Sequence, residues 1–127
     1  MRVREAAPPE YTELLSILDA AALRTDSDRI RAAIDRGAVL VALPDRPDGT
    51  DAPILGTLVL DGATIRAIAV RPGRRGQGVG RALVAHAQQS SQRLIAECDP
   101  GVRPFWEAVG FTITDESGGR LTGEWTA

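Results

Sequence analysis

Glycine and arginine residues crowd one short stretch of the chain, and this combination of residue types is typical of a site that binds anions. The stretch covers residues 67–83 and reads AIAVRPGRRGQGVGRAL. An apolar run ends at Val70, a Pro-Gly turn follows, and helical spacing of apolar residues begins at Val79. A glycine loop between a strand and a helix directs several backbone N–H groups and the positive end of the helix dipole at one point. Phosphate fits such a point, because a Cβ atom would hold the anion away from the backbone.

Spacing excludes the two most familiar phosphate loops. The P-loop requires a lysine after its second glycine, and the chain contains no lysine. The dinucleotide fingerprint also fails, because arginine or leucine stands where its third glycine is needed. What remains is the pattern R-x-x-G-x-G, formed by Arg75, Gly78 and Gly80 and preceded by V-x-P at residues 70–72.

This pattern is similar to the acetyl-CoA loop of the GCN5-related N-acetyltransferases, the GNAT family. A second block, FWEAVGF at residues 105–111, resembles the later aromatic–helix–Gly-Phe motif of that family. The close match covers roughly residues 54–111. The resemblance implies transfer of the acetyl group of acetyl-CoA to a primary amine of a small molecule or peptide, by direct attack in a ternary complex.

The resemblance also implies where acetyl-CoA binds. Its pantetheine arm is expected to pair with the backbone of residues 68–70 like an added strand, and its diphosphate to rest on the N–H groups of residues 76–81. A backbone N–H near residues 68–70 is expected to stabilise the oxyanion. The residues expected to bind acetyl-CoA are Ile68, Ala69, Val70, Arg75, Gly76, Gln77, Gly78, Val79, Gly80, Arg81, Phe105 and Trp106. Arg71 and Arg74 could also reach the phosphates, or could simply be solvated loop arginines.

The catalytic groups are less sharply indicated. Many family members place a glutamate on one of two splayed strands, and because residues 63–70 contain no carboxylate, Glu97 is the candidate general base, with a plain surface glutamate as the alternative. Asp61 and Asp99 are weaker candidates, since both stand where turns favour aspartate. The tyrosine that often protonates the departing thiolate is replaced by Trp106, whose indole N–H does not ionise usefully. The thiolate would then leave unaided, be protonated by water, or be released poorly.

Other readings of the same residues stay open. The alternative function is an acyl-CoA-binding regulatory or interaction module with little or no turnover. A nucleic-acid binder using the arginines of residues 71–81 is disfavoured by the formal net charge of −2. Cys98 is expected to be a buried, inert thiol, because no histidine is patterned near it. The resemblance implies that acceptor choice depends on residues 23–26 and on the end of the chain, and Asp26 and Asp28 hint at a cationic amine.

Composition bounds the class of protein. The 127 residues suit one domain spanning 1–127, and the charged and apolar fractions are ordinary for a soluble protein. A single cysteine and the lack of an apolar N-terminal segment predict a cytoplasmic protein without an internal disulfide. The expected partners are acetyl-CoA as cosubstrate and an amine acceptor, with no metal, no nucleic acid and no membrane. The expected state is a monomer or a homodimer.

The elements that must position these residues follow from the hydrophobic pattern. Strands are predicted at residues 2–6, 38–43, 54–60, 63–70, 94–98, 112–116 and 120–125, and helices from residue 10, from 26 or 27 to 37, from 78 to about 92, and at 102–109. A hairpin turn is predicted at Asp61 and Gly62. The order β-α-α-β-β-β-α-β-α-β-β predicts an α/β fold with a mixed sheet and helices on both faces, as in the GNAT acyl-CoA N-acyltransferases. In that fold, the strand before the glycine loop and the strand at 94–98 run parallel and splay apart.

Overall fold

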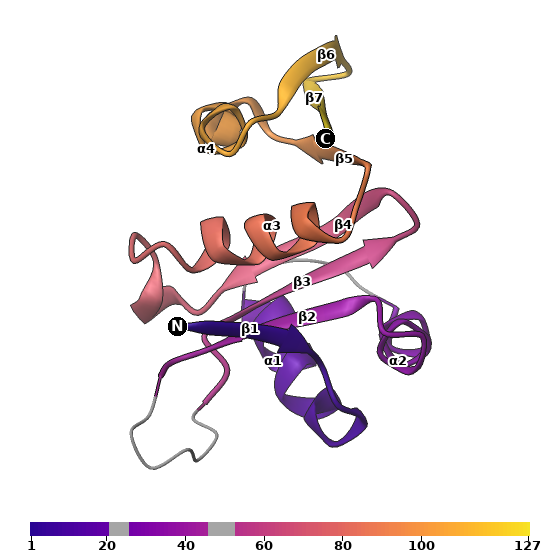
Figure 1. The fold of residues 1–127 in the computed structure, drawn as a ribbon, viewed down its shortest axis with the longest axis vertical. Helices are drawn as coiled ribbons and strands as arrows, with labels where there is room; N and C mark the ends of the chain where they lie inside the picture. Colours follow the sequence, from indigo (N-terminus) through magenta and orange to yellow (C-terminus); the bar gives the residue numbers. More distant parts are fainter. Residues whose placement is uncertain (21–25, 46–52) are drawn as a thin grey trace.

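A computed structural model describes residues 1–20, 26–45 and 53–127, which form a mixed seven-stranded sheet with helices on both faces (Figure 1). The strand order is β1-β2-β3-β4-β5-β7-β6. The strands are β1 (Arg2–Glu5), β2 (Val39–Leu43), β3 (Gly56–Asp61), β4 (Thr64–Val70), β5 (Arg93–Cys98), β6 (Thr112–Ser117) and β7 (Arg120–Thr126). The α-helices are α1 (Tyr11–Ala20), α2 (Ser27–Asp35), α3 (Val79–Gln89) and α4 (Arg103–Ala108). The predicted fold class and order of elements are confirmed.

Two hydrophobic clusters cover the two faces of the sheet. Leu83 of α3 and Trp106 of α4 belong to one cluster, and Leu14 of α1 and Ile34 of α2 belong to the other. Every residue of β2 is buried, because the strand lies between both clusters. Among the described residues, no helix has the length and apolar character needed to cross a bilayer.

The third strand begins two residues later than predicted, at Gly56 and not at Ile54. The backbone of Ile54 bonds to side chains: its N–H donates to Glu13 of α1 at 2.9 Å, and its carbonyl accepts from Arg71 at 2.6 Å. These bonds take the place of strand pairing at this residue. They also attach the start of β3 to α1.

Two further boundaries differ by a few residues. The hairpin turn consists of Gly62 and Ala63, because Asp61 still pairs with Thr64 across the hairpin. Helix α3 ends at Gln89, short of the predicted residue 92. Gln92 instead lies directly before β5, and its carbonyl accepts a hydrogen bond from the N–H of Ala127, just after β7, at 2.9 Å. The pattern of apolar residues in the sequence does not distinguish the last turn of α3 from the connection to β5 at residues 90–92.

A bulge interrupts the pairing of β3 with β4. The register passes from Val59 opposite Ala67 to Leu60 opposite Ile65, so Arg66 is an extra residue on β4. The bulge changes which face of the sheet each β4 side chain meets. Ile65 therefore packs on the α3 side, whereas Ala67, two residues later, packs on the α1 side.

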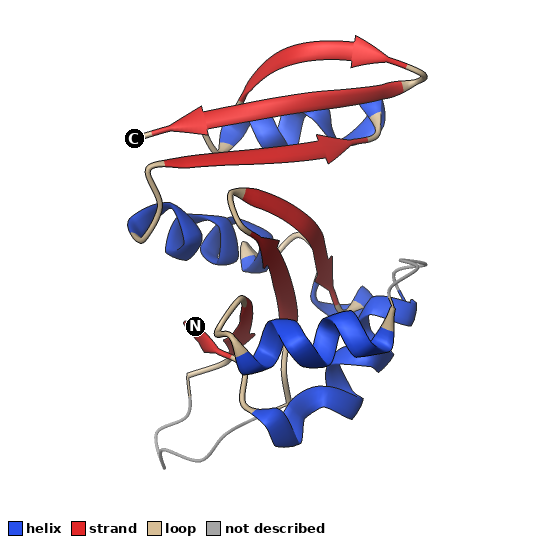
Figure 2. Cartoon of the chain, turned by 90° about the vertical axis from the view of Figure 1, so that its right-hand side faces the viewer, coloured by secondary structure: helices blue, strands red, loops and turns tan. Residues whose placement is uncertain are grey.

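The parallel strands β4 and β5 separate soon after they meet. Only two residue pairs join them, Thr64 with Ile95 and Ile65 with Ala96, although β5 stays paired with β7 as far as Cys98. Figures 1 and 2 both show β5, β7 and β6 turned away from β1 to β4. The predicted splay of these strands is confirmed. It leaves one edge of β4 without a strand partner from Arg66 onward.

Candidate functional site

The glycine loop ends in an exposed helix start. Gly76 and Gly78 have φ of 77° and 83°, a left-handed conformation that side chains with a Cβ disfavour. Gly78 is the N-cap of α3, and the amide of Ala82 makes the bond back to its carbonyl at 3.0 Å. The three preceding helical amides, residues 79–81, therefore point out of the helix end with no intrahelical partner. This arrangement concentrates N–H donors at the positive pole of α3.

A cavity of about 370 Å³ opens over this loop. It is lined by Val70, Arg74, Arg75, Gly76, Gly78, Val79, Gly80, Arg81 and Phe105. A Cβ added to Gly80 would meet the Phe105 ring at 3.3 Å, so the missing side chain lets α4 approach α3 here. The cavity combines arginines and backbone amides with an apolar wall, which suits a ligand with both phosphate and alkyl parts.

Four of the residues predicted to bind acetyl-CoA do not line this cavity. Gln77 lies exposed in the loop, and Ile68 is half-buried beside Gly80. The side chain of Ala69 is buried on the opposite, α1 side of the sheet. Trp106 is only 4% exposed.

The aromatic pair of α4 divides its roles between the cavity and the core. Phe105 faces the cavity, and Trp106 packs edge-on against it with ring centres 5.1 Å apart. Trp106 also meets Phe111 edge-on at 4.9 Å inside the α3-side cluster. The position at which the family resemblance leads one to expect a tyrosine therefore carries a core side chain.

The free edge of β4 presents backbone groups next to the cavity. The N–H of Arg71 donates to the carbonyl of Leu55 at 2.9 Å, on the β3 side. Backbone direction alternates along a strand, so Ala69 also faces β3, while the N–H and C=O groups of Ile68 and Val70 face the opposite edge. That edge lies beyond the last pair between β4 and β5. A ligand lying there could pair with the strand, as an added strand would.

Arg71 serves the fold and not the cavity. Its Nε donates to the carbonyl of Ile54 at 2.6 Å, and its Nη2 donates to Glu13 at 3.1 Å. These bonds join the end of β4 to α1, whereas Arg74, the other candidate arginine, lines the cavity. The sequence gives no signal for the bond between Arg71 and Glu13, because the two residues are 58 positions apart.

Glu97 is exposed and lies between two buried residues of β5 that face α3. Its side chain therefore points to the opposite face of the sheet. In the described part of the chain, no hydrogen bond or ion pair holds it. The two weaker carboxylate candidates are paired: Asp61 accepts from Arg66 at 3.3 Å, and Asp99 from Arg120 at 2.8 Å.

The remaining polar candidates have structural positions. Cys98 is a free thiol that is 5% exposed, and burial raises its pKa, so little thiolate forms near neutral pH. Tyr11 lies under the guanidinium of Arg31, 4.4 Å from its ring centre. Of the segment expected to choose the acceptor, residues 23–25 lie outside the described residues. Asp26 caps α2 by accepting from the amide of Asp28 at 2.9 Å.

Known proteins share both the sequence pattern and the fold. The family described as "Acetyltransferase (GNAT) domain" matches residues 35–113. Peptidyl-lysine N-acetyltransferase YjaB of Escherichia coli (strain K12) is 32% identical in an alignment of 93 residues, which covers 71% of this chain and only 60% of the length of that protein.

Two solved structures share the fold over the whole chain. Rv2747 from Mycobacterium tuberculosis, in complex with CoA, superimposes with a TM-score of 0.82 at 18% sequence identity. The match covers 100% of this chain and 99% of the Rv2747 chain. PaiA N-acetyltransferase from Thermoplasma acidophilum, in complex with coenzyme A, has a TM-score of 0.75 at 13% identity and covers 99% and 98%. Because the family match includes more than half of the residues, this chain belongs to the GNAT acetyltransferase family.

Proposed function

We propose that this protein is an N-acetyltransferase that moves the acetyl group of acetyl-CoA to a primary amine of a small molecule or peptide. The observation that carries the proposal is the cavity over the glycine loop, continuous in sequence with the free edge of β4. The relatives agree with it, since YjaB is named a peptidyl-lysine N-acetyltransferase and Rv2747 was solved with CoA. A cytoplasmic location, independence of metals and nucleic acid, and a monomeric or homodimeric state remain predictions.

We assign the parts of the cosubstrate to separate places along this cavity and the free edge of β4. The diphosphate would rest on the amides of residues 76–81, with Arg75 and Arg81 beside it. The pantetheine arm would pair with the free backbone groups of Ile68 and Val70. Phe105 would form the apolar wall near the thioester, held from behind by Trp106. Ala69 would contribute only backbone, and Gln77 would lie at the rim of the loop.

The reaction requires one bond to form and one to break. The neutral amine attacks the thioester carbonyl, the C–N bond forms and the C–S bond breaks, giving an N-acetyl amide and a thiolate. The amine nitrogen loses one proton and the thiolate gains one, so an amide and the free thiol of CoA are the products. Holding both reactants at the β4 edge supplies much of the rate. An outward N–H at Ile68 or Val70 would stabilise the negative carbonyl oxygen.

Proton transfer is assigned to Glu97 or to water. Glu97 stands on β5, the strand that separates from β4, and it is exposed and available to a water molecule. It would accept the proton of the attacking amine. Trp106 cannot donate a proton to the thiolate, so the thiolate would depart unaided or take a proton from water.

One observation favours a second candidate, an acyl-CoA-binding module with little turnover. Arginines are the only ionisable side chains that line the cavity within the described residues, so no side chain there can act as a proton donor at neutral pH. This candidate shares the cavity with the enzyme. Only turnover separates the two.

Calorimetric titration with CoA and a thiol-release assay with acetyl-CoA test both candidates. The assay would use a panel of small amines, polyamines, amino acids and peptides. We expect CoA to bind and thiol to be released with at least one class of amine. Binding without release from any acceptor would favour the module, and a failure to bind CoA would overturn both.

A further inference from the structure

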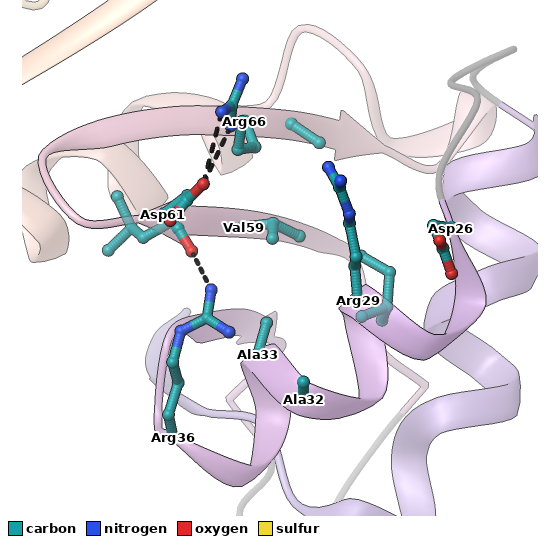
Figure 3. A pocket seen from close by; sticks show the side chains of 11 residues that line it. Asp26, Arg29, Ala32, Ala33, Arg36, Val59, Asp61 and Arg66 are labelled. Atoms are coloured by element: carbon teal, nitrogen blue, oxygen red, sulfur yellow. Dashed lines mark hydrogen bonds and ion pairs between the residues drawn. The ribbon is translucent and has the colours of Figure 1, made fainter.

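A second cavity, of about 680 Å³, lies between α2 and the β3–β4 hairpin (Figure 3). It is on the α1–α2 side of the sheet, whereas the glycine-loop cavity adjoins α3. Its floor is apolar and is formed by Ile30, Ala33, Val59 and Ala67. Its rim carries three arginines, Arg29, Arg36 and Arg66, and two aspartates, Asp26 and Asp61.

The arginines at this rim are only partly neutralised. Arg66 meets Asp61 at 3.3 Å, with 61% and 57% of these side chains exposed, so solvent weakens the pair. Arg36 donates to the carbonyl of Leu60 at 3.3 Å. Arg29 rises from α2 toward β4 in Figure 3 and has no hydrogen-bond or ion-pair partner in the described part of the chain. The guanidinium N–H donors at this rim therefore outnumber the carboxylate and carbonyl oxygens that accept from them.

The aspartates do not reverse this balance. The carboxylate of Asp26 is occupied as the N-cap of α2, and that of Asp61 by Arg66. Three positive charges face two negative charges in a chain whose formal net charge is −2. Guanidinium groups present paired N–H donors that match the oxygens of carboxylate or phosphate. The cavity is therefore suited to an oxyanion attached to a compact apolar group.

The position of the cavity relates it to the reaction. Ala67 lines the cavity, and the next residue, Ile68, turns its backbone groups to the free edge of β4. A strand rises about 3.3 Å per residue, so Arg66 lies roughly 7 Å along β4 from Ile68, one of the two residues whose outward N–H would stabilise the oxyanion. A molecule of amino-acid or dipeptide size could thus hold one end at the arginines and present its other end to the thioester.

We propose that this cavity binds the oxyanionic end, carboxylate or phosphate, of the acceptor, so that the substrate is an amine that also carries an anionic group. This inference rests on the proposed acetyltransferase function and names its substrate class. Arg29 and Arg66 are the residues that hold the anion. It adds an anionic group to the cationic amine that Asp26 and Asp28 suggested in the sequence.

Matched acceptors test the inference. Free amino acids and dipeptides would each be compared with their C-terminal carboxamides, and phosphoethanolamine with ethanolamine, in the thiol-release assay. We expect kcat/KM to be about tenfold or more higher for the anionic member of a pair, as is typical of a charge-assisted hydrogen bond. A preference for phosphoethanolamine over every carboxylate would assign phosphate, and the reverse would assign carboxylate. Equal rates within every pair would overturn the inference.

Substitution of the arginines tests whether the preference for anionic acceptors arises in this cavity. Arg29→Gln and Arg66→Gln should each raise KM for the anionic acceptor about tenfold and leave KM for acetyl-CoA unchanged. Arg31→Gln is the matched control, because it removes the same charge from α2 but lies outside this cavity. Unchanged acceptor KM in both cavity variants would contradict the assignment.

A binding measurement separates failure of this inference from failure of the enzyme. In 15N-labelled protein, N-acetylglycine and inorganic phosphate should change the NMR chemical shifts of the backbone amides of Ala33, Val59 and Ala67. Arg29→Gln should raise the Kd obtained from titrating these shifts about tenfold. Such chemical-shift changes without any turnover would support the anion-binding site and contradict the proposed acetyltransferase activity. Turnover without such chemical-shift changes, with carboxamides accepted as well as carboxylates, would contradict the anion-binding site and support the proposed acetyltransferase activity.

Discussion

The two cavities of this protein are built from different parts of the chain. The glycine-loop cavity takes nearly all of its lining from residues 70–81, with Phe105 added by α4. The cavity beside α2 takes its arginines from two segments, α2 and β4, that are 30 residues or more apart. In the first, the main donors are backbone amides at a helix start; in the second, they are guanidinium groups.

This difference decides how each site depends on sequence. Backbone donors require glycines with a particular conformation at particular spacings, so such a site leaves a readable motif. Side-chain donors require only that two elements pack next to each other, which leaves no local motif. Substitutions at Gly76 or Gly78 should therefore affect the first cavity alone, and substitutions at Arg29 or Arg66 the second alone.

The largest expected effect is the loss of the backbone site. Gly78→Glu places a carboxylate where phosphate should bind and forces a side chain into a left-handed conformation, at φ of 83°. We expect the Kd for CoA to rise about 100-fold or more, as for juxtaposed like charges. Gly118→Glu in the β6–β7 turn, at φ of 61°, is the matched control and should leave the Kd unchanged. Unaltered CoA binding by Gly78→Glu, measured calorimetrically, would remove this loop from the binding site.

Glu97→Gln tests whether the chemistry lies where β4 and β5 separate. We expect kcat to fall about 10- to 100-fold at low pH, because there the acceptor is protonated and needs a base. The loss should shrink as pH rises and the free amine becomes abundant. Asp99→Asn, an exposed carboxylate just beyond β5, is the control. A pH–rate profile identical to that of the unmodified protein would leave Glu97 as a surface residue.

A pair of arginines separates binding from folding. Arg75→Gln should raise the Kd for CoA about fivefold to tenfold with little change in stability, because Arg75 is exposed and lines the cavity. Arg71→Gln should lower the free energy of unfolding by about 1–2 kcal/mol, because it loses bonds to Ile54 and Glu13, with little change in Kd. Calorimetry and denaturant unfolding would measure both. The reverse pattern would make Arg71 the phosphate ligand.

The smallest effect concerns the acid sensitivity of the α1 side. Arg4 donates two 2.8 Å bonds to Glu10, and these lower the carboxyl pKa below its ordinary value of 4.5. A lowered pKa means that the ionised carboxylate stabilises the fold above that ordinary value, and that this stabilisation is lost as pH falls through the folded-state pKa. Glu10→Gln should therefore cost about 1 kcal/mol at pH 7 and progressively less toward acid pH.

Thermal unfolding at several pH values would measure this difference. Glu116→Gln is the control, because the carboxylate of Glu116 is 63% exposed in its pair with Arg103 and should contribute little. A stability difference for Glu10→Gln that does not change with pH would contradict the assignment to the ionised carboxylate.

Much of the fold was predictable because it depends on local pattern. Apolar periodicity and turn residues identified, in the correct order, each strand and each α-helix that the structure describes. The second helix was predicted to begin at Asp26 or Ser27, and Asp26 caps it, because an aspartate before a helical pattern can satisfy the first free amides. Boundaries were less accurate: β3 starts at Gly56 because side chains of distant residues bind the backbone of Ile54.

The direction of single side chains was the least predictable feature. Phe105 and Trp106 are neighbours in one motif, yet one faces the cavity and the other the core, a choice made by the packing of α4 against Gly80 of α3 and against β6. The bulge at Arg66 likewise has no sequence signal. It sends Ala67 to the α1 side and brings Arg66 beside α2.

The sequence by itself determined the order of elements, the two-sided burial of the sheet and the glycine loop at the start of α3. These features depend on residue periodicity and on the conformational freedom of glycine, which are properties of neighbouring residues. Only the tertiary structure decided the free edge of β4, the bond between Arg71 and Glu13, and the arginine cavity beside α2. Those features arise where segments far apart in the sequence meet, and no pattern within a single segment records such a meeting.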